Sequence, residues 1–129
     1  MIIGIGIDTV EVNRFCNWHT YSQKKLSRIF THDEIEYCLR SNSAQRFAVR
    51  FAAREAFFKA LSYAYPQHTI PFFSVCRYSM IEKKEGRPVF IFNWNCISEL
   101  IGNNNMPRVH VSFTHTAQQA TALVIIEYV

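Results

Sequence analysis

Two carboxylates in this sequence, those of Asp8 and Glu55, lie in surroundings that suit a metal ion. Asp8 ends a strand-like run in which Gly4 and Gly6 share its face, so a ligand or backbone group could approach the carboxylate closely. Glu55 would lie on a long helix between a phenylalanine stripe and an alanine face, where its charge is partly buried. Oxygen ligands of this kind suit a hard cation. The local sequence also allows Asp8 to cap the next turn, and Glu55 to pair with Lys59 one helical turn on.

Two further side chains could act on a phosphate. Lys59 would place an ammonium group beside the possible metal site. His115 closes an alternating run whose apolar members are Val109, Val111 and Phe113, and a polar turn follows it. The plainer interpretation of His115 is a half-buried histidine bonded to backbone.

Basic residues form two groups that allow two interpretations each. Arg46, Arg50 and Arg54 share one helix face, which is either solvated or a phosphate-binding stripe. The same two interpretations apply to a second group nearer the N-terminus, which consists of Lys24, Lys25 and Arg28. Neither group can be assigned from its spacing alone.

The composition predicts one folded domain with a modest positive charge. The chain has 129 residues, 49% of them hydrophobic, with 14 Lys and Arg against 10 Asp and Glu, for a formal net charge of +4. That apolar content can build a core over residues 1–129 and excludes disorder. The positive charge favours an anionic partner, which could be a nucleic acid, a phosphorylated small molecule or an acidic protein.

Targeting and redox signals are missing from the sequence. The N-terminal run has no basic segment before Asp8, and no apolar stretch is long enough to cross a bilayer. The four cysteines are scattered, without the Cys-x-x-Cys pair of zinc and redox sites. We therefore expect a cytoplasmic protein with reduced cysteines and no membrane contact.

The periodicity of the sequence predicts an α+β fold. Alternation predicts a strand over Ile2–Asp8, with the isoleucines on one face and the glycines on the other. The strongest helix is expected over Ser43–Ala64, where five alanines between Ala48 and Ala60 form a smooth face suited to close packing. The other expected elements are a helix-like segment over 13–30, a helix from the Thr31–Glu34 capping box through Leu39, strands over 72–81 and 89–92 around a turn at 85–88, a helix over 94–101 stopped by Gly102, and a hairpin of 109–115 with 121–129.

The order and spacing of three segments resemble the holo-acyl-carrier-protein synthase family, the short phosphopantetheinyl transferases. The segments are 4–8 with Glu11 and Arg14 downstream, 50–60 (RFAAREAFFKA) and 111–116 (VSFTHT). Two shorter signatures, Phe30-Thr31-x-x-Glu34 and Gly86-Arg87-Pro88, also match. The resemblance implies the phosphopantetheinyl transferase fold, an antiparallel sheet packed on the long helix.

The resemblance also implies a reaction in support of fatty acid biosynthesis. A 4′-phosphopantetheine group passes from coenzyme A to a serine of apo-acyl carrier protein, and adenosine 3′,5′-bisphosphate is released. Asp8 and Glu55 match the Mg²⁺ ligands of the family, Lys59 matches the lysine that steadies a phosphate or the leaving group, and His115 matches the histidine near the coenzyme. The base is Glu55 or a metal-bound water, and the sequence leaves both open.

Binding roles follow from the same resemblance. Arg50 and Arg87 are candidates for the adenosine and 3′-phosphate end of coenzyme A. The basic residues Arg14, Lys24, Lys25 and Arg28 fall where the family meets its acidic carrier protein. Family members form trimers with active sites between subunits, so a homotrimer is expected here.

Two positions depart from the family pattern. Residues 62–66 read Ser-Tyr-Ala-Tyr-Pro where a Gly-Thr-Gly type of loop is usual, and Thr114 stands where serine is common. Because of this altered loop, one alternative is a catalytically degenerate family member that only binds a carrier protein. The pI of about 9.0 and the aromatic content keep a small nucleic-acid-binding module as another alternative, which would bind without Mg²⁺.

Overall fold

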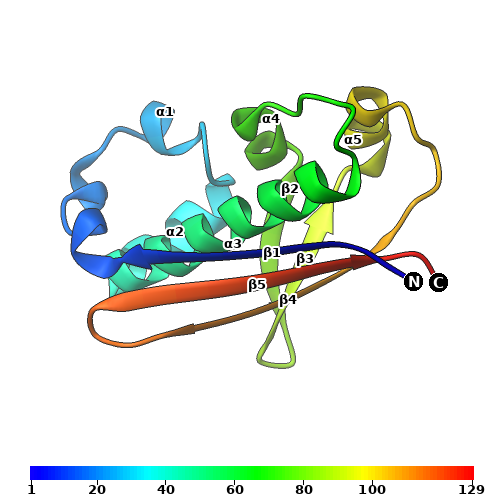
Figure 1. Cartoon of the computed structure of the whole chain (residues 1–129). Helices are drawn as coiled ribbons and strands as arrows, with labels where there is room; N and C mark the ends of the chain where they lie inside the picture. The colour runs from blue at the N-terminus through cyan, green and yellow to red at the C-terminus, as the bar shows by residue number, and fades with distance from the viewer.

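A three-stranded antiparallel sheet and one long helix form the two main layers of this computed structural model, which describes residues 1–129. The sheet has the order β1-β5-β4, and a separate hairpin joins β2 to β3. Figure 1 shows helix α3 lying along β1 and β5, with α1, α4 and α5 on its other side. The bounds are β1 Ile2–Glu11, α1 Gln23–Leu26, α2 His32–Arg40, α3 Ser43–Ala64, α4 Phe72–Arg77, β2 Ser79–Lys84, β3 Arg87–Phe92, α5 Trp94–Ile101, β4 Arg108–His115 and β5 Gln119–Glu127.

Glycines on β1 allow the sheet to approach α3 closely. A Cβ atom on Gly6 would overlap the carbonyl oxygen of Ala56, and one on Gly4 would overlap that of Ala60. The predicted alternation and the predicted alanine face are therefore confirmed as two halves of one contact. The strand continues three residues beyond Asp8, and its isoleucines face outward, with Ile5 51% and Ile7 58% exposed.

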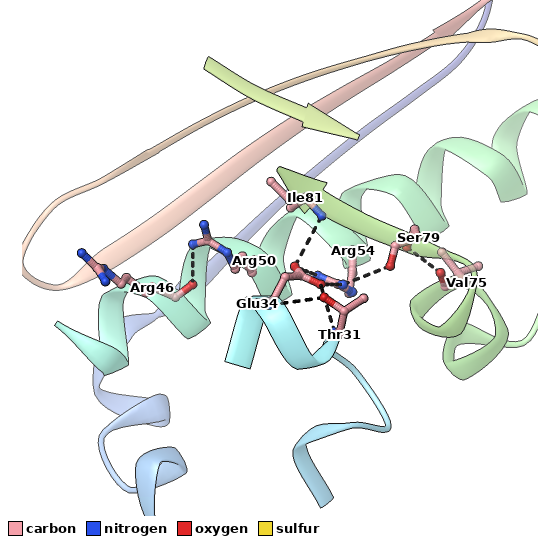
Figure 2. A network of polar contacts seen from close by, with 8 residues as sticks. All are labelled: Thr31, Glu34, Arg46, Arg50, Arg54, Val75, Ser79 and Ile81. Atoms are coloured by element: carbon pink, nitrogen blue, oxygen red, sulfur yellow. Dashed lines mark hydrogen bonds and ion pairs between the residues drawn. The ribbon is translucent and has the colours of Figure 1, made fainter. Parts of the chain in front are cut away.

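The arginine side of α3 is not a solvated face. Arg50 is 4% exposed and Arg54 is completely buried, because α2 and β2 pack over this side of the helix. Arg54 donates to both carboxylate oxygens of Glu34 and to the Ser79 carbonyl, the latter at 3.1 Å. Figure 2 shows that Glu34 also accepts from Thr31 in the capping box of α2 and from the Ile81 backbone. One buried carboxylate thus joins α2, α3 and β2.

Two sequence predictions of secondary structure are wrong. Residues 13–30 form no continuous helix but two 3-10 turns, Val12–Phe15 and Trp18–Thr20, followed by the short α1. This segment is fixed by aromatic packing around Trp18 and not by the apolar face of a regular helix. The apolar run from Phe72 begins as α4 after Pro71, and only its end, from Ser79, is strand.

The remaining elements agree with the expected pattern. The capping box starts α2, α5 ends at Gly102 with φ 64°, and β4 and β5 form the C-terminal hairpin. Glu85 and Gly86 have φ of 51° and 76°, which places both in the left-handed region that a tight hairpin turn requires. None of the helices combines the length and the apolar character needed to cross a membrane.

Candidate active site

Asp8 and Lys59 form an ion pair at the edge of the sheet where β1 meets α3. Lys59 Nζ donates to Asp8 Oδ1 at 2.9 Å and to the Ile7 carbonyl at 3.0 Å. The pairing of Lys59 with Glu55 that the sequence allowed is therefore wrong, and so is the turn cap at Asp8, because β1 runs on to Glu11. Asp8 Oδ2 is buried and has no hydrogen-bond partner.

Glu55 shares this space with Asp8. Burial raises the pKa of Glu55, and the negative charge of Asp8 raises it further, while Lys59 and Arg14 act in the opposite direction. Both main influences disfavour two ionised carboxylates without an additional cation. No group of three or more His, Cys, Asp or Glu side chains is arranged so that it could hold a metal ion. Mg²⁺ is commonly held by one or two carboxylates with phosphate and water, so Asp8 and Glu55 form a donor set that fits it.

A cavity of about 420 Å³ opens beside Glu55. Its walls are mostly aromatic and apolar, and three cations lie among them. Arg14 places its guanidinium 4.8 Å from the centre of the Phe51 ring, and Lys25 lies 3.8 Å from that of Tyr21. The lining residues are Arg14, Trp18, Tyr21, Lys25, Leu26, Arg28, Ile29, Phe51, Glu55, Phe72 and Phe73. The structure therefore brings three of the four expected carrier-binding residues to the carboxylate; Lys24 lines the adjoining hollow with Arg28.

His115 and Arg87 lie apart from the carboxylates within one chain. His115 lies on β4, two strands away from β1, and pairs with Ala120 of β5, which in turn pairs with Val10 of β1. Standard strand spacing therefore puts the Cα of His115 about 12 Å from that of Asp8. Its side chain is exposed and makes no hydrogen bond, so the expected half-buried, backbone-bonded histidine is wrong. Arg87 is exposed beside the turn of the β2–β3 hairpin.

A second basic cluster surrounds Tyr37 of α2. The guanidinium groups of Arg46 and Arg50 lie 4.0 and 4.5 Å from the centre of its ring, and Lys83 lies 5.8 Å from it. Burial acts to raise the pKa of Tyr37, but the nearby positive charges of Lys83, Arg46 and Arg50 lower it overall. The buried Nε of Arg50 has no partner.

Sequence reasoning missed Tyr37 and Lys83, because a lone tyrosine on a short amphipathic helix carries no signal of the cations that other elements bring to it. Sequence reasoning also missed the role of Trp18, Phe72 and Phe73 in the cavity wall. Their aromatic character was visible, but the predicted helix over 13–30 and strand over 72–81 concealed their position.

Comparisons with known proteins agree with this fold. Residues 4–123 match the 4′-phosphopantetheinyl transferase superfamily, and the chain belongs to that family. It is 38% identical over 129 residues to a holo-[acyl-carrier-protein] synthase of Treponema denticola, covering 98% of this chain and 99% of the relative.

Solved structures show the same architecture. The holo-[acyl-carrier-protein] synthase of Neisseria meningitidis has a TM-score of 0.78 at 27% identity, covering 99% of this chain and all of that one. The Bacillus anthracis enzyme, solved in complex with CoA (3′,5′-ADP), has a TM-score of 0.73 at 28% identity and covers 98% of this chain and 97% of that one. The predicted α+β fold, with an antiparallel sheet on a long helix, is confirmed.

Proposed function

We propose that this protein is a holo-acyl-carrier-protein synthase that transfers 4′-phosphopantetheine from coenzyme A to a serine of apo-acyl carrier protein. The observation that carries the proposal is the Asp8, Glu55 and Lys59 group, which combines a lysine-bound carboxylate, an unsatisfied buried oxygen and a second carboxylate of raised pKa. The names of the relatives at 32–38% identity support this reaction.

The reaction requires attack of the serine oxygen on the phosphorus that carries pantetheine. A new oxygen–phosphorus bond forms, the bond to the bridging oxygen breaks, and adenosine 3′,5′-bisphosphate leaves with the electron pair. Mg²⁺ bound by Asp8 and Glu55 would neutralise charge on the pyrophosphate. Lys59 is oriented by Asp8 and the Ile7 carbonyl, so its ammonium group can stabilise charge that develops on a phosphate oxygen. The proton of the serine hydroxyl passes to a base, for which Glu55 and a metal-bound water are the two candidates.

Coenzyme A needs positive charge at its adenosine and 3′-phosphate end. Arg50, which lines a hollow with Tyr37 and Lys83, and the exposed Arg87 are our candidates, and His115 is our candidate near the coenzyme phosphates. Because His115 and Asp8 occupy opposite edges of the sheet, a neighbouring subunit can supply the groups that one chain holds apart.

We propose a homotrimer for this reason. The exposed isoleucines of β1 and the 37% exposed Leu123 of β5 form an outward apolar surface that a subunit contact would cover. Residues 1–129 would act in each subunit as one domain, since one cluster of 29 buried residues spans α3 and both sheets. We place the protein in the cytoplasm, in fatty acid biosynthesis.

The alternatives are not favoured. A degenerate carrier-binding relative would have no need of Asp8, Glu55 and Lys59, yet all three are present and in contact or close together. A nucleic-acid-binding module has no support among the relatives.

The test is loss of transfer in Asp8→Asn and Glu55→Gln. Each substitution removes a charge without removing volume, so the folded state should persist while product formation falls at least about 100-fold, about 3 kcal/mol in the barrier. Glu99→Gln, at an exposed carboxylate on α5 that lines none of the cavities and forms no ion pair, is the matched control. Transfer by both variants at the control rate, measured by mass spectrometry of the carrier protein, would refute the proposal.

A further inference from the structure

Helix α4 carries two exposed residues that the roles above leave unexplained. Phe73 is 49% exposed, and Arg77 lies exposed one turn later on the same helix. With Lys24, Ser27 and Arg28 they line a hollow of about 280 Å³, called here the α4 hollow. The Arg28 guanidinium lies 4.6 Å from the centre of the Phe73 ring, so an aromatic surface sits among cations.

The cations of the α4 hollow have no acidic partner. Lys24, Arg28 and Arg77 take part in none of the four ion pairs of the chain, and no Asp or Glu lines the hollow. Three uncompensated charges around a half-exposed ring favour an anionic partner with an apolar side chain. A small anion would leave the ring uncovered.

The α4 hollow is continuous with the cavity beside Glu55. Arg28 and Phe73 line both, so one surface leads from the reacting carboxylates to Arg77. At the inner end of this surface the acceptor must reach Glu55 and the pyrophosphate that it attacks. A protein with an acidic surface would place only its reacting residue there.

We propose that the α4 hollow is part of the docking surface for the acceptor protein, with Phe73 covered by an apolar side chain and Arg77 facing carboxylates. This inference rests on the proposed transfer, and it adds α4 to the basic residues of the N-terminal segment. It also makes docking depend on charge, because the cations are exposed and screened by salt.

The test compares charge changes at Arg77 with the same changes at Arg40. Both arginines are exposed and lie in the last turn of a helix, and Arg40 lines none of the cavities described. Arg77→Gln should raise the KM for apo-acyl carrier protein about threefold and Arg77→Glu about tenfold at low salt, and Phe73→Ala should raise it about tenfold. In the Arg77 variants the kcat and the KM for coenzyme A should stay unchanged, because Arg77 does not line the cavity beside Glu55, and the Arg40 variants should match wild type.

Several outcomes decide the proposal. The proposal is overturned if Arg77→Glu and Phe73→Ala both have a KM for carrier protein within twofold of that of the Arg40 variants. In that case the transfer activity of these variants would leave the proposed function standing. An equal rise in the KM for coenzyme A would assign the α4 hollow to the coenzyme and overturn it as well. If wild type neither modifies nor binds the carrier protein in a direct binding measurement, the proposed function itself fails.

Discussion

The buried ion pair between Glu34 and Arg54 should be the most sensitive point of the fold. Glu34→Gln keeps the shape of the side chain and an oxygen for the capping box, in which glutamine is also accepted. It removes the only negative charge that faces a guanidinium of zero exposure, whose Nε already lacks a partner. Removing one member of such a pair strands a buried charge, which costs about 3–5 kcal/mol.

The measurement is urea unfolding followed by tryptophan fluorescence. With a denaturant slope of about 2 kcal/mol/M, the Glu34→Gln midpoint should fall by about 2 M. Glu36→Gln is the matched control, because Glu36 lies on the same helix in an exposed pair with His32, and it should change stability by about 0.5 kcal/mol or less. Adding Arg54→Met to Glu34→Gln removes the stranded charge and should recover at least about 1 kcal/mol. Equal midpoints for Glu34→Gln and Glu36→Gln would refute the reasoning.

Two other predictions concern packing and thiol reactivity. Gly6→Ala should destabilise the fold by about 3 kcal/mol or more in the same unfolding assay, because its Cβ would overlap the backbone of Ala56; a loss below about 1 kcal/mol would show that β1 can move away from α3. Burial raises the pKa of Cys38 and of Cys76 to about 12, so both remain protonated as the pH rises from 7 to 9. In the native protein an alkylating reagent should therefore modify the exposed Cys16 increasingly over that range, while peptide mapping finds the two buried thiols intact; their modification before unfolding would contradict the burial.

Sequence reasoning located the elements that are governed by local chemistry. The alternation of Ile2–Asp8, the alanines of α3, the capping box and Gly102 all act within a few residues, and each was confirmed. The sequence predicted the glycine face of β1 and the alanine face of α3 separately, because the contact between them forms only in the tertiary structure.

Features that depend on distant partners were missed. Arg54 was assigned to a helix face that is either solvated or phosphate-binding, because its true partner Glu34 lies twenty residues away on another helix. Lys59 was paired with Glu55 by helical spacing, whereas the β1 strand brings Asp8 closer to its ammonium group. The apolar run from Phe72 gave no periodicity that could separate a short helix from a strand.

The assignment of Asp8 and Glu55 as metal ligands came from a family resemblance joined to residue chemistry. The local sequence allowed Asp8 to cap a turn and Glu55 to pair with Lys59. The structure excludes both, because β1 continues past Asp8 and Lys59 pairs with Asp8. The metal and coenzyme roles themselves stay predictions.

The measurement that tests the central claim most directly is the intact mass of an apo-acyl carrier protein after incubation with this protein, coenzyme A and Mg²⁺, beside a parallel reaction with chelator. We expect a gain of one phosphopantetheine group on the carrier serine, lost with chelator. An unchanged carrier mass with several apo-carrier proteins, under conditions where the protein is folded, would contradict the transferase assignment.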